Sequence, residues 1–208
     1  MRGRAFADLH LADRIARGEL DPRTGQRPCG FSGAGVIALC GGGGSGSGDI
    51  FGTTTPTGGA VIGNFSLGTK FYASRSGKIT GVRAYYTAGQ GSATRTAHLW
   101  SSAGTSLASV ALTGTTATGW NTWTFATPYA IAASTEYVVS LYEASQGVGY
   151  TASLFASGDW QGTGGAYLWA YQNGGSAGNN GVYLSGSDGF PTSSGGNGYF
   201  VDALFSFP

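Results

Sequence analysis

The stretch "GAYLWAYQNGG" carries three large aromatic side chains, Tyr167, Trp169 and Tyr171, each two residues apart. Side chains two apart on a β-strand point to the same face, so a strand here would place the three rings in one row. Such a row either fills a hydrophobic core or forms a platform on which the C–H face of a sugar ring stacks. A row of large rings is more typical of a core, and that arrangement would turn the residues between them outward.

Polar side chains that could bind sugar hydroxyls lie on both sides of this row. Trp160 stands in a polar, Gly-flanked segment, so we expect it to be a contact residue even if the row is buried. Rings beside amides and carboxylates are what carbohydrate recognition requires. The candidate glycan-binding residues are Trp160, Tyr167, Trp169, Tyr171, Asp159, Gln161 and Asn173.

Two further residues are expected to stabilise the fold and not to form a binding site. Asp202 lies in the middle of an expected strand, between Phe200 and Leu204. A buried lone carboxylate is costly, so it needs a cation or several amide donors. Arg83, also in the middle of an expected strand, is the predicted partner, and we expect Arg83 and Asp202 to form a structural pair.

Catalytic and metal-binding patterns are not found. The sequence has no GxSxG, no phosphate-binding loop and no paired histidine motif. A serine hydrolase needs a histidine within reach of a nucleophile, and a glycosidase needs two carboxylates across a cleft. The one histidine of the expected sandwich, His98 in "AHLWS", is expected to be a surface or second-layer residue. We therefore expect no enzyme activity, no metal site and no cofactor.

The elements that must position these residues are β-strands. Glycine makes up 39 of the 208 residues, and each glycine inside a helix costs on the order of 1 kcal/mol. Short alternating segments closed by Gly, Ser, Asn or Thr predict an all-β fold, an antiparallel β-sandwich or jelly roll. The expected strands are 66–74, 78–87, 94–101, 106–113, 120–127, 136–144, 165–172, 181–185 and 198–207.

The chain divides into three parts by composition. Residues 1–28 hold most of the arginines, residues 29–48 are an apolar patch followed by a Gly/Ser tether, and residues 49–208 form the β-sandwich module. Residues 1–28 are expected to be a helical or extended docking arm, ordered only against a partner. Its docking residues are Phe6, Leu9, Ile15 and Leu20.

Charge and cysteine content exclude several classes of partner. Charged residues are 10% of the chain, with 11 Lys and Arg against 10 Asp and Glu, so nucleic acid and membrane insertion are not expected. The N-terminus has no apolar signal segment, and Leu39 before Cys40 argues against lipid attachment. Cys29 and Cys40 are expected to be small buried hydrophobes, with a disulfide as the alternative.

Several motifs occur in an order that resembles a known family. "LGTKF", "GKITGVRAYY", "GWNTWTFATP", "EYVVSLY" and "YFVDALF", with others between them, span residues 64–205 and are similar to the bacterial domain-of-unknown-function family 4082. This resemblance implies a β-sandwich module, often attached to extracellular glycan-acting or adhesive proteins, without established catalytic residues. The chain departs from the pattern at Phe200, where the family usually has Trp, and in a Gly-rich insert at 156–179.

The order of docking arm, tether and sandwich resembles a virion appendage of a tailed phage or gene-transfer particle. We expect a capsid-surface spike, fibre or decoration protein, assembled in the host cytoplasm into a symmetric oligomer. Its partners would be capsid or tail proteins bound through residues 1–48, and host surface polysaccharide. The alternatives are an extracellular carbohydrate-binding or adhesion module, and a purely structural cement protein.

Overall fold

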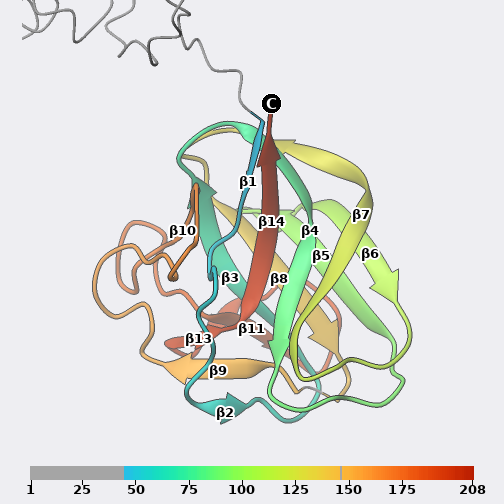
Figure 1. The fold of residues 1–208 in the computed structure, drawn as a ribbon. Coiled ribbons are helices and arrows are strands. Elements are labelled where there is room, and N and C mark those ends of the chain that lie inside the picture. The colour runs from blue at the N-terminus through green and yellow to red at the C-terminus, as the bar shows by residue number, and fades with distance from the viewer. Residues whose placement is uncertain (1–44, 146) are drawn as a thin grey trace, which may run out of the picture. The chain divides into compact units, whose positions relative to one another are not determined.

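The computed structural model describes residues 45–145 and 147–208. This part of the chain consists of β-strands, turns and loops (Figure 1), which confirms the all-β prediction. In chain order the strands are β1 Gly46–Gly48, β2 Gly59–Ala60, β3 Phe65–Ala73, β4 Gly77–Tyr86, β5 Arg95–Ser101, β6 Ser106–Leu112, β7 Gly119–Ile131, β8 Tyr137–Glu143, β9 Gly149–Ala152, β10 Leu168–Ala170, β11 Val182–Ser185, β12 Ser193–Ser194, β13 Asn197–Tyr199 and β14 Val201–Phe207.

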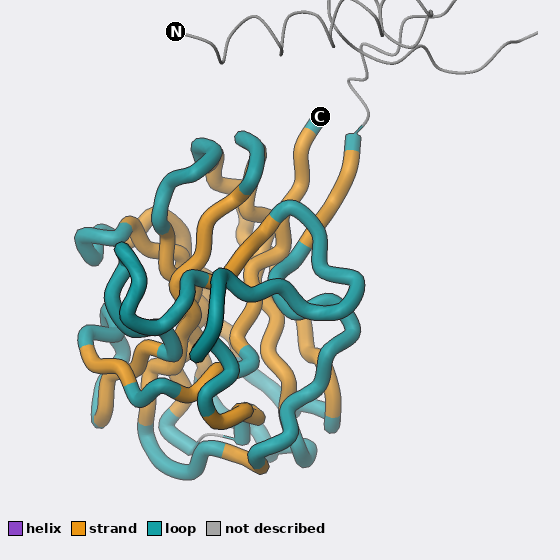
Figure 2. Tube along the Cα trace, turned by 90° about the vertical axis from the view of Figure 1, so that its left-hand side faces the viewer, coloured by secondary structure: helices purple, strands orange, loops and turns teal. Residues whose placement is uncertain are grey.

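The strands form two main antiparallel sheets and a smaller one. The four-stranded sheet has the order β1-β14-β4-β7, and the seven-stranded sheet has the order β12-β11-β3-β8-β5-β6, with β10 added to β3. A three-stranded sheet, β13-β9-β2, lies at the end of the module opposite the C-terminus (Figure 1). Seen from the side, loops cover one flank of the strands (Figure 2), and the long connection between β9 and β11 makes up much of this cover.

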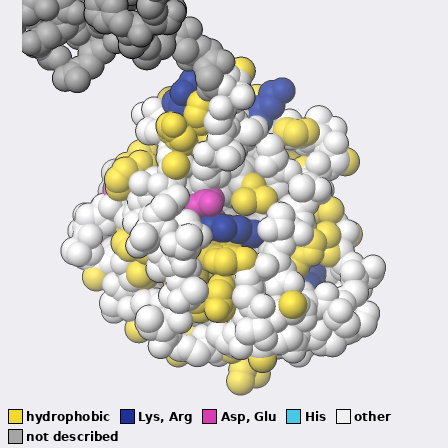
Figure 3. Space-filling view, viewed as in Figure 1, with side chains coloured by type: hydrophobic (Ala, Val, Ile, Leu, Met, Phe, Trp, Pro, Cys, Tyr) yellow, Lys and Arg dark blue, Asp and Glu magenta, His cyan; other side chains and the backbone are white. Residues whose placement is uncertain are grey.

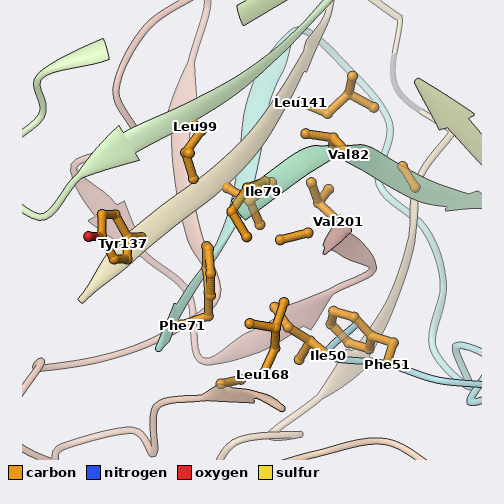
Figure 4. Packing of buried hydrophobic residues seen from close by; sticks show 14 of the residues in the cluster. Ile50, Phe51, Phe71, Ile79, Val82, Leu99, Tyr137, Leu141, Leu168 and Val201 are labelled. Atoms are coloured by element: carbon orange, nitrogen blue, oxygen red, sulfur yellow. The ribbon is translucent and has the colours of Figure 1, made fainter. Parts of the chain in front are cut away.

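The hydrophobic core lies between the two main sheets (Figure 4). On β14, Val201, Ala203 and Phe205 alternate inward, as the two-residue period of a strand requires. On β3, Phe71 and Leu67 point to the same core. Each main sheet therefore has one apolar inner face, and its outer face is free to carry polar and aromatic side chains.

All nine expected strands are present in the described residues, but three of them differ in extent, and one of these is 120–127, which continues to Ile131 in β7. The segment 165–172 contains only the short strand β10, which begins after Tyr167 because the positive φ of 68° at that residue interrupts the extended backbone. The segment 198–207 is interrupted at Phe200, which separates β13 from β14. The strands β1, β2, β9 and β12 were not predicted, since each has only two to four residues.

The predicted boundary at residue 48 is wrong by a few residues. Gly46, Ser47 and Gly48 form β1 and pair with β14, whereas the sequence assigned them to the tether. Glycine allows this pairing, because a Cβ at Gly46 would collide with the ring of Phe207. The docking residues Phe6, Leu9, Ile15 and Leu20, and also Cys29 and Cys40, lie outside the described residues.

Candidate functional site

The strand β10 places Trp169 on the outside of the sandwich. Trp169 pairs with Tyr72 of β3, whereas Leu168 and Ala170 on either side of it are fully buried. Leu168 lies beside Ile50 in the core (Figure 4). The expectation that the aromatic row fills the core is therefore wrong, since the smaller residues between the rings occupy that space.

Three rings make up what we call the aromatic surface: Tyr72, Trp169 and Tyr171. Residues paired across antiparallel strands point to the same side, so Tyr72 and Trp169 share the outer face. The centroids of the Tyr72 and Tyr171 rings are 5.0 Å apart, with an interplanar angle of 50°. All three side chains are half-buried, so each keeps part of its ring accessible.

Asp159 adds a carboxylate to the aromatic surface. It is exposed, and its Oδ1 accepts a hydrogen bond of 2.9 Å from the backbone N–H of Gln172. Burial, followed by a side-chain hydrogen bond with Asp159 and the charge of that carboxylate, raises the pKa of Tyr72 to about 12. At neutral pH the Tyr72 hydroxyl is therefore protonated, and Asp159 joins the aromatic rings as a hydrogen-bond acceptor.

Asn180 holds the chain around the aromatic surface in place, although it was not among the predicted site residues. Its side chain is fully buried; Oδ1 accepts from the backbone N–H of Lys70 and Nδ2 donates to the carbonyls of Lys70 and Tyr171, at 2.8 to 2.9 Å. The next residue, Gly181, has a φ of 66°, and a Cβ there would collide with the carbonyl of Asn197. The Asn-Gly pair was a visible turn signal, but the buried amide was not.

Two of the predicted contact residues have other surroundings. Trp160 is half-buried and packs against Phe51 and Phe155, with centroid distances of 5.2 and 6.0 Å, so its ring joins the core cluster and not the aromatic surface. Tyr167 is 38% exposed, but its ring lies 4.6 Å from that of Phe207, on the other main sheet. The positive φ of Tyr167 takes it out of the two-residue alternation, so it does not join Trp169 and Tyr171.

The two predicted amide side chains, Gln161 and Asn173, form hydrogen bonds with the backbone of neighbouring segments. Nε2 of Gln161 donates to the carbonyl of Leu168 at 2.8 Å. Oδ1 of Asn173 accepts from the backbone N–H of Asn180 at 2.7 Å. Of the seven predicted glycan-binding residues, the structure thus brings together Trp169, Tyr171 and Asp159, and adds Tyr72, which the sequence analysis missed.

The structure places Arg83 against Asp202, as the sequence pattern predicts. Asp202 is fully buried and accepts from Nε and Nη2 of Arg83 at 2.9 and 2.8 Å, and from the backbone N–H groups of Ile50 and Phe51. Nη2 of Arg83 lies 3.2 Å from Asp49, and its guanidinium is 4.1 Å from the ring centroid of Trp120. Burial raises the pKa of Asp202 to about 6, against the lowering effect of Arg83.

This pair fastens the segment before β2 to the outer face of the four-stranded sheet. In the space-filling view, acidic and basic side chains meet in the middle of this face, and most of the surrounding surface is uncharged (Figure 3). Because the carboxylate has four donors and the guanidinium is engaged on several sides, the pair has a structural role.

His98 fastens a loop to the outer face of the seven-stranded sheet. Its Nε2 lies 2.8 Å from Oδ1 of Asp188, and its ring stacks on Trp100 at 4.6 Å. The hydroxyl of Ser140, on the neighbouring strand, accepts from Nε1 of Trp100 at 2.8 Å. His98 is thus a second-layer residue beneath a loop.

Within residues 45–145 and 147–208, no group of three or more His, Cys, Asp or Glu could hold a metal ion. The same residues contain no helix that is long and apolar enough to cross a membrane.

The fold and this site define an all-β sandwich module with an aromatic surface on one outer face. The model of a protein family, the domain of unknown function DUF4082, matches residues 53–201, and the chain belongs to this family. The match covers the Gly-rich insert that carries Trp169 and Tyr171. No match is found among curated proteins.

Proposed function

We propose that the sandwich module is a non-enzymatic binding module that recognises carbohydrate on a cell surface. The observation that carries this proposal is the outward position of Tyr72, Trp169 and Tyr171, while smaller residues fill the core behind them. Half-buried rings have a fixed orientation, so they lose little conformational freedom when a ligand binds. They supply the flat apolar contact that the C–H face of a sugar ring needs.

The polar groups beside the rings suit sugar hydroxyls. Asp159 is exposed, and among the residues that the structure describes its carboxylate is engaged by one hydrogen bond from the backbone N–H of Gln172 and by the contact with Tyr72. A carboxylate offers about four lone-pair sites, so Asp159 keeps acceptor capacity for hydroxyl groups. Flat rings beside a planar acceptor are a general sugar-binding arrangement, and the low charge of the chain favours a ligand that is held by stacking and hydrogen bonds.

A glycan array with the full chain tests this proposal. We expect binding to a restricted set of glycans, and we expect Trp169→Ala to weaken it at least about tenfold, which corresponds to about 1.4 kcal/mol. Tyr167→Ala is the matched control, because Tyr167 is an exposed aromatic residue outside the aromatic surface. Thermal unfolding of both variants verifies that they fold. Absence of any glycan bound by the wild-type chain would contradict the proposal and favour a purely structural role.

We further propose that the module is displayed on a virion, anchored through its N-terminal segment. The supporting observation is the order of an arginine-rich arm, an apolar patch and a Gly/Ser tract in the sequence ahead of β1, which begins at Gly46. Repetition of the module on a symmetric particle would let weak individual contacts add up to firm attachment. The competing role is an extracellular adhesion module that is not attached to a particle.

Purified particles from a producing culture separate these two roles. We expect the full chain to sediment with capsid protein in a density gradient, and a chain that lacks residues 1–28 to remain in the unbound fraction. Recovery of the full chain only as free protein in the culture fluid would contradict the virion role and leave the carbohydrate-binding proposal intact.

A further inference from the structure

A hollow of about 250 Å³ lies near the aromatic surface, over the outer face of the seven-stranded sheet. Its lining includes Lys70, Glu136, Asn179, Val182, Phe190 and Thr192. Lys70 and Tyr72 lie two residues apart on β3 with buried residues on either side, so both face outward, roughly 7 Å from each other. One extended ligand can therefore contact the hollow and the rings together.

The hollow has the mixed lining of a sugar-binding subsite. The ring of Phe190 packs edge-on against Trp100, with centroids 5.7 Å apart, and forms an apolar wall. Asn179 and Thr192 are exposed and supply an amide and a hydroxyl group. A wall of this kind with a few polar groups around it is typical of small-ligand pockets, and its volume lies just below the usual range of roughly 300–1,000 Å³.

The two charged residues of the hollow keep hydrogen-bonding capacity for a ligand. Nζ of Lys70 donates to the carbonyl of Ala177 at 2.5 Å, and this ammonium group has three donors. Among the described residues, the carboxylate of Glu136 forms no hydrogen bond and no ion pair. One positive and one negative group in the same hollow give no net attraction for an ionic ligand, but they supply donors and acceptors for hydroxyl groups.

Rigid coupling joins the hollow to the aromatic surface. The side chain of Asn180 bonds the backbone of Lys70 on one side and that of Tyr171 on the other. Glu136 is close enough to Tyr171 that its charge contributes to the raised pKa of that phenol, after burial. The two surfaces therefore keep a fixed spacing, which favours a ligand that is itself a chain of linked rings.

We propose that this hollow is a second subsite of the same carbohydrate site and takes a neutral, hydroxyl-rich sugar ring at one end of a linear oligosaccharide. The other rings of that oligosaccharide stack on Tyr72, Trp169 and Tyr171. This inference rests on the proposed carbohydrate-binding function. A uronic acid in the hollow would gain no net attraction, because Glu136 offsets Lys70, and its carboxylate would lose hydration on binding, so the hollow favours neutral sugars.

The test uses the full chain on an array of neutral oligosaccharides and their uronic-acid counterparts, from two to six rings long. Titration calorimetry then follows with cellohexaose, maltohexaose and xylohexaose as neutral probes and with hexagalacturonic acid as the acidic probe. We expect neutral six-ring chains to bind more tightly than two-ring chains, and all of them more tightly than the acidic probe. Asn179→Ala should weaken binding of the six-ring chain about fivefold, the effect of one lost hydrogen bond, and leave the two-ring chain unaffected.

Glu136→Gln probes the charge of the hollow without changing its size. It should shift the preference toward hexagalacturonic acid by about tenfold, because the variant removes the repelling carboxylate and leaves Lys70. Thr127→Ala, an exposed threonine on β7 of the other main sheet, is the control and should change neither ligand.

Each result distinguishes the two proposals. If Trp169→Ala abolishes binding while Asn179→Ala and Glu136→Gln bind like the wild type, the subsite is wrong and the carbohydrate-binding function stands. Tighter binding of the acidic probe by the wild-type chain overturns the preference for neutral sugars. No glycan bound on the array overturns both proposals.

Discussion

The two main sheets each carry charged and aromatic residues on the outer face, but the surroundings of these residues differ. On the four-stranded sheet, Arg83 and Asp202 satisfy one another, and two backbone amides complete the environment of the carboxylate. On the seven-stranded sheet, Lys70 and Glu136 form no ion pair within the described residues, and the neighbouring rings stay partly accessible. The same residue types therefore stabilise the fold in one place and remain available for a ligand in the other.

This difference shows that exposure and unused hydrogen-bonding capacity are better guides to a site than residue type. A buried and fully paired charge has its binding capacity used within the fold, and removal of one partner is expensive. A half-exposed ring or an unpaired charge on the surface contributes little to the fold, so substitution there should affect binding before stability.

The largest expected effect is on the four-stranded sheet. Asp202→Ala leaves Arg83 and the N–H groups of Ile50 and Phe51 without their acceptor, so the free energy of unfolding should fall by about 3–5 kcal/mol. Chemical denaturation measures this loss, with Asp49→Ala as the control, because Asp49 is partly exposed and should cost much less. Equal effects of the two variants would mean that Asp202 does not hold this face together.

The burial of Asp202 also predicts how the stability of the fold depends on pH. Burial raises the pKa of Asp202 from 3.8 to about 6, so the folded state binds this proton more tightly than the unfolded chain. Its stabilising contribution is complete below about pH 4 and is lost as pH rises through about 6, by roughly 3 kcal/mol. Unfolding free energies at pH 4 and pH 7.5 should show this trend relative to Asp202→Asn, in which the titrating group is missing. A difference that does not vary with pH, or that grows as pH rises, would contradict it.

A smaller effect is expected at the turn that supports the aromatic surface. Gly181→Ala places a side chain on a left-handed backbone, and its Cβ would collide with the carbonyl of Asn197. The free energy of unfolding should therefore fall by at least about 2 kcal/mol. Gly174→Ala is the matched control, because Gly174 also has a positive φ but has open space around it. The difference between the two unfolding free energies isolates the collision. If both variants lose the same amount, the packing of Gly181 against Asn197 does not matter.

The smallest effect is on the titration of Tyr72. Asp159→Asn removes the charge of Asp159 and weakens its hydrogen bond with Tyr72, so the pKa of Tyr72 should fall from about 12 toward 10. Burial is the larger cause and remains, so the fall should be partial. Ultraviolet absorbance or NMR titration follows the phenol directly, and Asp188→Asn serves as a control because Asp188 pairs with His98 elsewhere. If the pKa of Tyr72 is unchanged in Asp159→Asn, Asp159 does not interact with the aromatic surface.

Much of the fold was predictable because strand patterns are local. The alternation in "KITGVRAYY" and "EYVVSLY" marks β4 and β8 to within a residue or two, and Arg83 and Asp202 were paired from their places in the middle of two strands. The site was predicted only in part. Trp169, Tyr171 and Asp159 do lie together, but Tyr72 was overlooked, and Trp160 and Tyr167 were assigned to a surface that they do not share.

The amino-acid sequence by itself determined the secondary-structure class, the alternation along each strand and the residue types available for a site. Those properties follow from backbone preferences and from the two-residue period of a strand. Only the tertiary structure decided which face of β10 is buried. Leu168 and Ala170 occupy the core beside Phe71 and Ile50, and Trp169 therefore lies on the outer face. It also decided that the Asn180 side chain is buried and holds neighbouring segments together, since two of its four hydrogen bonds are with Lys70, which lies 110 residues away.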